Sequence, residues 1–419
     1  MFMHNWLSKF SWITPYWVLL YVACWPWRGM AEFALSMGSL IGLSLLITAR
    51  FKQGTRLLTH EAWALTTILF LAYWLPELFS VIDSYDVRHS AIETFKDLRY
   101  LPFLWLVCMS CASERGRKIL TVGLSAIIIF WVLDATVQAL CGYNLRGYVQ
   151  ADRLTGIFGQ GNLKLGPILA SISPFLLVPA AQRFGFKAWC IAALLLGIVI
   201  MLAGSRAAWI SFAIALIWSG LHYWHWKKTL AMLAVSVVMA IIAAFSFPDF
   251  SARLQRTFAI IDDSSGSLDH AVSGRLVIWG KAWQIFLDHP VNGVGVDQFQ
   301  PVYRNYTGPG DQFVDYGRPG AFHAHQIILE ILSETGLLGL LFWLMGAAIA
   351  IRAWMFASTA ARTAAFPAAM ALCITVFPFN THLAFYSTFW GGLTLLLLAI
   401  YVGCLSADQA NVTTRSPSN

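Results

Sequence analysis

Long apolar stretches, separated by short polar connections, recur along most of this sequence of 419 residues. Most of them are about 17–25 residues long, which is the length that a helix needs to cross the hydrocarbon layer of a membrane. Backbone in lipid must satisfy its hydrogen bonds internally, which favours helices, and the short alternating strands of a membrane β-barrel are not evident. The pattern therefore predicts an all-α polytopic membrane protein.

About twelve transmembrane helices are predicted, the fourth short enough to be a half-span. They cover 12–27, 30–49, 63–82, 101–112, 119–140, 163–181, 188–203, 207–224, 230–247, 337–354, 365–383 and 389–405. The seventh and eighth form a tight hairpin that turns at Gly204-Ser205-Arg206. The chain is thus divided into helices 1–9 (1–247), one large polar loop (248–336), helices 10–12 (337–406) and a polar tail (407–419).

Composition supports a membrane protein and weakens the case for nucleic acid. Hydrophobic residues make up 58% of the chain and charged residues only 12%, against roughly 25% charged in soluble domains. The net charge is +7. The basic residues cluster in the short connections between apolar stretches, where they indicate the orientation of the spans in the membrane. The seven cysteines form no zinc or disulfide pattern. The first apolar stretch is expected to be an anchor, since no cleavage site follows it.

The positive-inside rule gives the orientation of the spans. One set of short connections is rich in Lys and Arg: Arg50, Lys52, Arg56, Arg115, Arg117, Lys118, Arg183, Lys187, Lys227, Lys228, Arg352 and Arg362. This set is expected to be cytoplasmic, together with both termini. The large loop then lies on the far side, which is the periplasm in a Gram-negative cell, beside a second outer loop at Asp83–Arg99.

Two outer arginines are candidates for binding an anion. Arg206 lies in the turn between two apolar helices, where it is either a snorkelling side chain or an anion contact. Arg275 begins a segment with apolar residues at helical spacing, predicted to be an amphipathic helix on or near the membrane surface. The planar guanidinium group suits phosphate, and helix starts favour anions. The alternative for Arg275 is a solvated surface residue.

His323 and His325, near the end of the large loop, have three readings. A metal pair is disfavoured because no third or fourth ligand has suitable spacing, so no metal and no cofactor are expected. One histidine is a candidate general base, since histidine titrates near neutral pH. The third reading is a pair of hydrogen-bonded structural residues. Arg153, beside a glycine-rich loop at 159–162, is a weaker candidate for ligand contact, and Asp134 is an intramembrane carboxylate.

Taken in order, three motifs resemble the superfamily of bacterial O-antigen ligases and their relatives. They are Gly204-Ser205-Arg206, then Arg275 through Gly295 with Trp, His-Pro and Gly-x-Gly, then His325 followed by Leu329, Glu334, Gly336 and Gly339. Members usually have Asn after the histidine, where this chain has Gln326.

The resemblance implies a glycosyltransferase-C-like helical fold in the bacterial inner membrane. It also implies transfer of a preassembled glycan from undecaprenyl diphosphate to a sugar hydroxyl of lipid A–core, on the periplasmic face, with inversion and without metal. By the same resemblance, His325 is expected to be the catalytic base, and Arg206 and Arg275 are expected to bind the donor diphosphate. His323, Arg153 and Glu334 are further candidates.

Several alternatives remain at this stage. An O-antigen polymerase uses the same donor with a second lipid-linked glycan as acceptor. A protein O-oligosaccharyltransferase is expected to be longer at its C-terminus. From a different class, a lipid-linked sugar transporter would need a charged cavity through the membrane, and a scaffold would not need the arginines and histidine to converge. The partners expected are the lipid-linked donor, lipid A–core and membrane lipids, and no nucleic acid.

Overall fold

The computed structural model describes residues 13–53, 57–149, 153–246, 251, 274–308, 311, 313–314, 320–382 and 384–407. These residues form helices, and the one β-bridge among them pairs Tyr143 with Val149. The all-α prediction is thereby confirmed. Most of the predicted polar tail lies outside the described residues.

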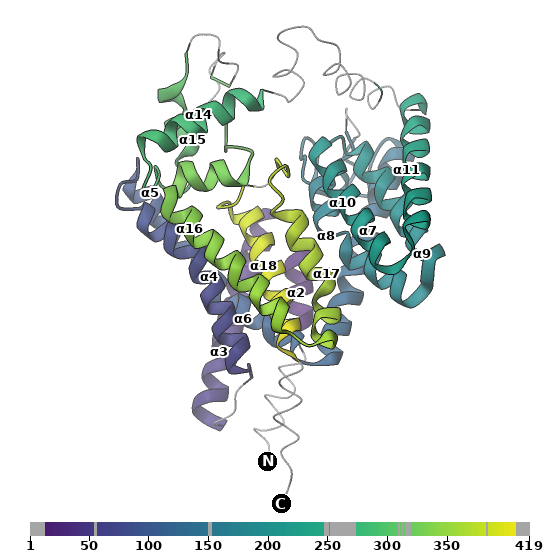
Figure 1. The fold of residues 1–419 in the computed structure, drawn as a ribbon, viewed down its shortest axis with the longest axis horizontal. Helices are drawn as coiled ribbons and strands as arrows, with labels where there is room; N and C mark the ends of the chain where they lie inside the picture. The colour runs from purple at the N-terminus through teal and green to yellow at the C-terminus, as the bar shows by residue number, and fades with distance from the viewer. Residues whose placement is uncertain are drawn as a thin grey trace, which may run out of the picture.

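The helices pack into a bundle, and one end of the bundle is covered by shorter helices (Figure 1). In order they are α2 (Thr14–Ala23), α3 (Arg28–Gln53), α4 (His60–Ser80), α5 (Val87–Asp97), α6 (Tyr100–Cys111), α7 (Glu114–Cys141), η1 (Gly156–Phe158), α8 (Leu165–Ile172), α9 (Pro174–Leu202), α10 (Arg206–Tyr223), α11 (Trp226–Ser246), α14 (Arg275–Asp288), α15 (Phe299–Tyr303), η2 (Arg304–Tyr306), α16 (Ile327–Phe356), α17 (Thr359–Thr375) and α18 (Thr388–Leu405). We call the end that carries α5, α14 and α15 the capped end.

Six helices in the described part of the chain are long and apolar enough to cross a membrane: α3, α4, α7, α9, α16 and α18. The protein is therefore a multi-pass membrane protein, but twelve full spans are not shown. The predicted span at 12–27 contains only the short helix α2, and the predicted half-span at 101–112 corresponds to the short helix α6. The 10 residues of α2 and the 12 of α6 extend only about 15 and 18 Å at 1.5 Å per residue, against roughly 30 Å of hydrocarbon.

Glycine breaks two of the long helices. Gly185 has a non-helical backbone (φ 78°, ψ −165°) inside α9, and Gly336 (φ 65°, ψ −161°) divides α16. The first break falls in the connection predicted between two spans. The second coincides with the predicted end of the large loop, so the loop finishes in a helical segment, Ile327–Thr335, that leads directly into a membrane span.

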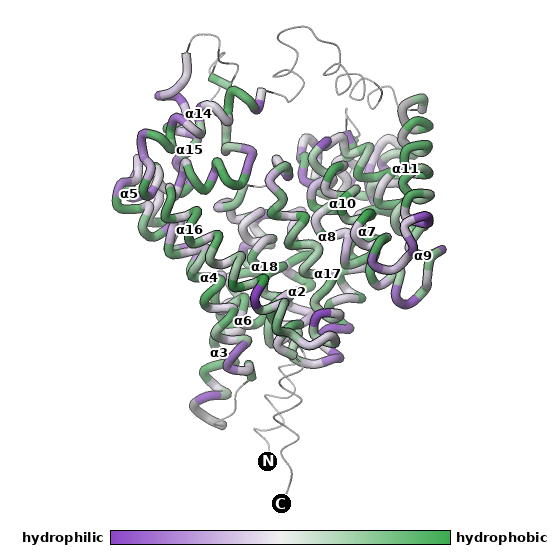
Figure 2. The backbone as a smooth tube through the Cα atoms, viewed as in Figure 1, coloured by the Kyte–Doolittle hydropathy of each residue, from purple (hydrophilic) through white to green (hydrophobic). Residues whose placement is uncertain are grey.

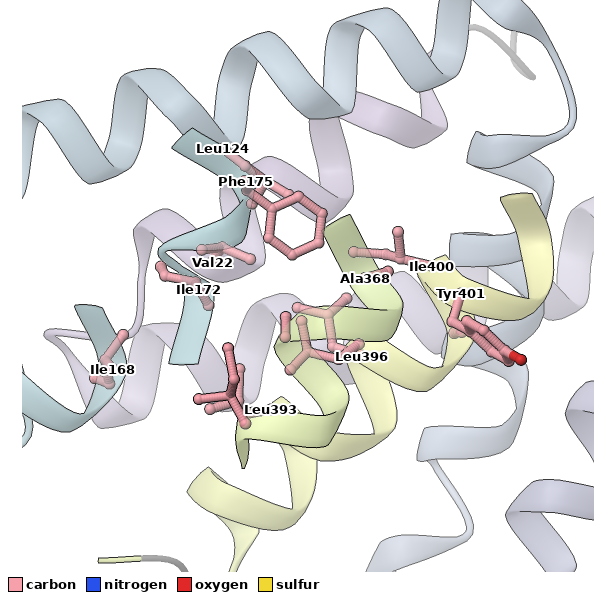
Figure 3. Packing of buried hydrophobic residues seen from close by; sticks show 14 of the residues in the cluster. Val22, Leu124, Ile168, Ile172, Phe175, Ala368, Leu393, Leu396, Ile400 and Tyr401 are labelled. Atoms are coloured by element: carbon pink, nitrogen blue, oxygen red, sulfur yellow. The ribbon is translucent and has the colours of Figure 1, made fainter. Parts of the chain in front are cut away.

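The main core lies between the helices of the bundle. Figure 3 shows α2, α7, α8, α17 and α18 interlocking through aliphatic side chains such as Val22, Ile168 and Leu396, all buried. Apolar residues also cover the outside of the bundle, as Phe33 and Leu40 do on α3. Figure 2 shows this hydrophobic band between polar ends. A bundle that is apolar inside and outside is suited to lipid surroundings.

The large loop builds a small core of its own at the capped end. Ile278, Ala282 and Ile285 of α14 pack with Phe299 and Tyr303 of α15. The amphipathic helix predicted from Arg275 is confirmed. One apolar face of this helix is buried against α15 and α16, while Leu276, Trp283 and Leu287 are exposed. An apolar stripe at helical spacing suits a protein partner as well as a lipid surface.

The two predicted outer loops pack together. The backbone N–H of Tyr85 donates to the carbonyl of Val294 (2.9 Å), and Ser90 Oγ donates to the carbonyl of Val296 (3.0 Å). His89 Nε2 lies 2.8 Å from Asp297 Oδ2. The segment 83–99 thus packs against the large loop and holds it against the end of the helical bundle.

Candidate functional site

The break in α16 is built from two glycine motifs that contact each other. The N–H groups of Leu337 and Leu338 lose their helical acceptors at the break and donate instead to the carbonyls of Pro290 and Val291 (2.9 and 3.1 Å). In return, Val294 and Gly295 donate to the carbonyls of Ser333 and Glu334 at 3.0 Å. The turn after α14 therefore runs along the broken helix and satisfies its exposed backbone groups.

Only glycine fits on either side of this contact. A Cβ on Gly336 would overlap the carbonyl oxygen of Val291 and lie 2.6 Å from the amide nitrogen of Asn292. A Cβ on Gly293 would lie 2.5 Å from the carbonyl oxygen of Glu334. Both glycines also have positive φ (65° and 68°), which side chains rarely adopt. The two motifs thereby lock α14 to the helix that follows the histidines.

His325 immediately precedes α16 in a strained backbone conformation. Its φ is 55°, which is uncommon for any residue except glycine. The next residue, Gln326, caps the helix, since its Oε1 accepts a hydrogen bond from the N–H of Leu329 at 2.6 Å. An asparagine at this position carries the same amide oxygen on a shorter arm. The change from Asn to Gln therefore keeps a side-chain cap.

A backbone contact fixes the orientation of the His325 ring. Its Nδ1 lies 2.8 Å from the carbonyl oxygen of Thr381, in the connection between α17 and α18. A carbonyl only accepts hydrogen bonds, so Nδ1 carries the proton and Nε2 keeps its lone pair. This is the tautomer that a general base acting through Nε2 requires.

Two further histidines lie beside His325. The ring centroids of His323 and His325 are 3.9 Å apart. Burial lowers the pKa of His325 to about 4, with a smaller lowering by the charge of Arg275 and an opposing effect of the Thr381 hydrogen bond. Burial also lowers the pKa of His382 to about 3 and that of His323 well below its usual range, with further lowering by Arg275. All three rings are neutral at pH 7.

The two arginines predicted to bind an anion lie close enough to affect each other. Burial, with a smaller contribution from the positive charge of Arg206, lowers the pKa of Arg275 to about 10. Each arginine is the first residue of its helix: Arg206 follows the cap Ser205, whose Oγ accepts from the N–H of Ala208 (3.3 Å), and Arg275 follows Gly274. Two positive charges within electrostatic range of each other, each at a helix N-terminus, favour binding of an anion.

The glycine-rich loop reaches the same region. The N–H of Leu154 donates to the carbonyl of Leu202 (3.3 Å), which brings the loop to the α9–α10 turn. Gln138 Oε1 accepts from the N–H groups of Thr155 and Gly156 (3.1 and 2.8 Å) and fixes the loop. Arg153 contributes to the lowered pKa of His382. This residue therefore lies within electrostatic range of His382.

Three carboxylates connect segments of the chain. Glu334 Oε1 accepts from the N–H of Phe299 (3.4 Å) at the start of α15, and Glu330 Oε1 accepts from the N–H of Tyr386 (3.4 Å) before α18. Asp134 accepts from the N–H of Leu145 (3.0 Å). The contact of Glu334 therefore positions the large loop against α16.

His382 was missed by the sequence reasoning. The apolar pattern extended a span over 365–383, whereas α17 ends at Thr375 and the connection to α18 contains Pro378, Asn380 and His382. Proline and asparagine close together mark a turn, and this signal was available. A polar connection at the capped end would have made its histidine a candidate.

The assembled group is cationic, basic and partly buried. Arg206 and Arg275 can hold an anion, and neutral His325 can accept a proton through Nε2. The described residues include no cluster of three or more His, Cys, Asp or Glu side chains with metal-binding geometry. The arginines can stabilise a leaving anion, and the histidine can remove a proton from a hydroxyl.

Comparison with known proteins identifies the middle of the chain. No curated protein matches the sequence significantly. Residues 191–344, from within α9 to within α16, match a family model described as O-antigen ligase. Members of this ligase and polymerase family are glycan-transferring enzymes. The matched segment contains Arg206, Arg275, His323, His325 and Glu334. This multi-pass membrane protein therefore carries a domain of the O-antigen ligase family over residues 191–344.

Proposed function

We propose that the protein is an O-antigen ligase of the bacterial inner membrane. It transfers a preassembled glycan from undecaprenyl diphosphate to a sugar hydroxyl of lipid A–core and so completes lipopolysaccharide. The observation that carries the proposal is that Arg275 lies within electrostatic range of both Arg206 and His325, whose Nδ1 is held by Thr381. The capped end faces the periplasm, and both termini lie in the cytoplasm.

The reaction is a single displacement at the anomeric carbon. The acceptor hydroxyl oxygen forms a bond to that carbon as the bond to the diphosphate oxygen breaks, which inverts the configuration. The hydroxyl proton passes to Nε2 of His325, and the bonding electrons leave with undecaprenyl diphosphate. His323 and His382 complete the wall around the base, and Arg153 adds positive charge.

The arginines act on the leaving group. Diphosphate gains negative charge as the bond breaks, and fixed cations stabilise that charge most in the transition state. The loss of one such donor typically costs about 3–4 kcal/mol of barrier. In this proposal Arg206 and Arg275 perform the task that a divalent metal performs in other transferases. Transfer by the purified protein is expected to survive excess chelator, and loss of activity there would contradict it.

Donor binding also improves the base. A histidine with a pKa of about 4 is a weak base at neutral pH. An anion bound between Arg206 and Arg275 offsets the positive charge that lowers the pKa of His325 and so raises that pKa. His325 is therefore the strongest base when the donor is bound. The acceptor hydroxyl is then deprotonated mainly when a donor is present to react with it.

The proposed fold follows from the same reading. We assign the protein a glycosyltransferase-C-like arrangement in which about twelve helices, several of them shorter than a full span, pass through or into the membrane. The large loop at 248–336 carries Arg275 and His325, Arg206 comes from the α9–α10 turn, and the break at Gly336 separates the loop from the membrane segment.

Complementation in cells tests the ligase activity. In cells that lack their native ligase gene, the wild-type chain is expected to restore capped lipopolysaccharide, and His325→Ala to abolish it while lipid-linked glycan accumulates. His60→Ala is the matched control, since His60 is an exposed histidine at the start of α4. Normal capping by the His325 variant would contradict the catalytic role.

The family match covers polymerases as well as ligases, so the acceptor decides between them. A polymerase extends a second lipid-linked glycan with the same donor chemistry. A protein O-oligosaccharyltransferase modifies a protein hydroxyl, and a transporter moves the lipid-linked sugar without breaking its diphosphate bond. Each leaves a different product, and the ligase alone produces glycosylated lipid A–core.

A further inference from the structure

A second cavity lies at the capped end, outside the arginine and histidine group. Its volume is about 530 Å³. It is bounded by the end of α2, the start of α3, α5, the start of α18 and residues Val296 and Asp297 of the large loop. None of Arg153, Arg206, Arg275, His323 or His325 lines it. The proposed chemistry therefore leaves this cavity unused.

Aromatic rings form one wall of the cavity. Trp25 lies with its ring centroid 5.9 Å from that of Tyr21 and 5.7 Å from that of Phe389, and Phe389 lies 5.0 Å from Trp390. All four residues line the space. Rings of this kind offer flat apolar faces, on which the C–H face of a sugar ring packs well.

Polar and charged side chains also border the cavity. Glu77, Asp97 and Arg99 are among its lining residues. Binding sites for small polar molecules combine apolar and aromatic walls with a few placed polar side chains. The cavity has that combination.

Charges of both signs lie on the rim, together with Lys164, whose Nζ lies 4.0 Å from the ring centroid of Phe389. Arg28 Nε lies 3.0 Å from Glu32 Oε1, and Arg99 lies 4.0 Å from the other oxygen of the same carboxylate. Lys96 pairs with Glu93. A phosphate site would have positive charge without interspersed carboxylates. Paired charges with aromatic walls and a few polar groups suit a neutral ligand rich in hydroxyls.

The cavity lies close to the proposed reaction centre. The connection between α17 and α18 contributes the carbonyl of Thr381 to His325, and it contributes Ala384 to the cavity. Three residues of chain extend at most about 11 Å. Tyr386, which also lines the cavity, is fixed by its N–H to Glu330 (3.4 Å) and its hydroxyl to Thr335 (2.8 Å). The connection between α17 and α18 therefore borders both the reaction centre and the cavity.

We propose that this cavity, between Trp25, Glu77 and Phe389, is a subsite that binds a neutral sugar unit of the transferred glycan or of the acceptor. The inference rests on the proposed transferase function and adds where the sugars beyond the reacting pair are held. Its residues bind sugar and take no part in bond breaking. Their loss is expected to weaken binding of one substrate and leave the chemical step intact.

Steady-state kinetics in proteoliposomes tests the subsite. Glu77→Gln and Trp25→Phe each remove or alter one hydrogen-bonding atom, and Ala31→Phe fills the space. Each is expected to raise the KM of one substrate, donor or lipid A–core, about tenfold, with kcat within about twofold of wild type. The substrate whose KM rises identifies the source of the sugar. The controls are Glu61→Gln, exposed at the far end of the same helix, and Trp226→Phe, 53% exposed on α11.

A binding measurement separates this inference from the proposed function. Lipid-free core oligosaccharide and lipid-free donor glycan are titrated while tryptophan fluorescence is followed. Wild type is expected to bind one of them, and Ala31→Phe to lose that binding while retaining its unfolding temperature. Saturable binding unchanged in all three variants, or both KM values within twofold of wild type, would overturn the subsite. Absence of transfer by wild type would contradict the proposed function alone.

Discussion

The contact between the two glycine motifs predicts that Gly336→Ala destabilises the protein strongly. An added Cβ would lie 2.6 Å from the amide nitrogen of Asn292 and overlap the carbonyl oxygen of Val291, whereas carbon atoms pack well at about 3.5–4.0 Å. Both clashing groups are backbone atoms, so no side chain can rotate away. The segment Val291–Asn292 must move by about 1 Å.

Two costs determine how much Gly336→Ala lowers the free energy of unfolding. The backbone at Gly336 (φ 65°, ψ −161°) lies in a region that is essentially restricted to glycine, where another residue costs roughly 1–3 kcal/mol. Overpacking adds about 1–3 kcal/mol. The hydrogen bonds from Leu337 and Leu338 to the turn weaken as it moves. A loss of about 3 kcal/mol in the free energy of unfolding corresponds to roughly a hundredfold change in the folded-to-unfolded ratio.

Denaturation of purified protein in detergent, followed by tryptophan fluorescence, measures the effect. Gly280→Ala is the matched control, because Gly280 lies inside α14 and a Cβ there would meet no atom within 4 Å. That change is expected to be neutral or to stabilise by about 0.5–1 kcal/mol. Equal stability of Gly336→Ala and wild type would refute the account of the break. Gly293→Ala is expected to act in the same direction, since its Cβ would lie 2.5 Å from the carbonyl oxygen of Glu334.

Three further predictions concern the candidate site. The lowered pKa of His325 keeps its ring neutral down to about pH 4. The value of kcat/KM should therefore stay level from pH 7 to pH 5 and fall below pH 5. A fall of kcat/KM with its midpoint near pH 6.5 would contradict this, because an ordinary histidine titrates there. Arg206→Lys should lose most transfer in the capping assay, since lysine cannot offer the bidentate fork, and full activity would indicate a simple charge requirement. Gln326→Asn should retain transfer and stability, whereas Gln326→Ala, without the cap to Leu329, should lose about 1 kcal/mol of stability by denaturant titration; equal values would contradict the cap.

The sequence was sufficient for the broad architecture and for the main site residues. Apolar periodicity and span length found the helices, because lipid requires both. The count of spans was less accurate because helix length and burial depend on neighbours. The short helix α6, with Leu106 and Cys111 fully buried, gains its stability from packing and not from lipid.

The site was predictable where chemistry restricts the residue type. Arginine in a tight turn and histidine at a helix start were visible in the sequence, and in the structure Arg275 lies within electrostatic range of both Arg206 and His325. The role of Glu334 and the presence of His382 at the site could not be predicted from the sequence, since both depend on how distant segments meet. The cavity at Trp25 combines segments far apart in the chain, and no local pattern indicated it.

The acceptor used by the purified protein tests the central claim most directly. Wild-type protein is reconstituted in liposomes with an undecaprenyl-diphosphate-linked glycan and both acceptors, lipid A–core and a second lipid-linked glycan. The account predicts that glycan moves to lipid A–core in wild type and that His325→Ala, folded to the same unfolding temperature, moves none. Extension of the second lipid-linked glycan instead, or undiminished transfer by the His325 variant, would contradict it.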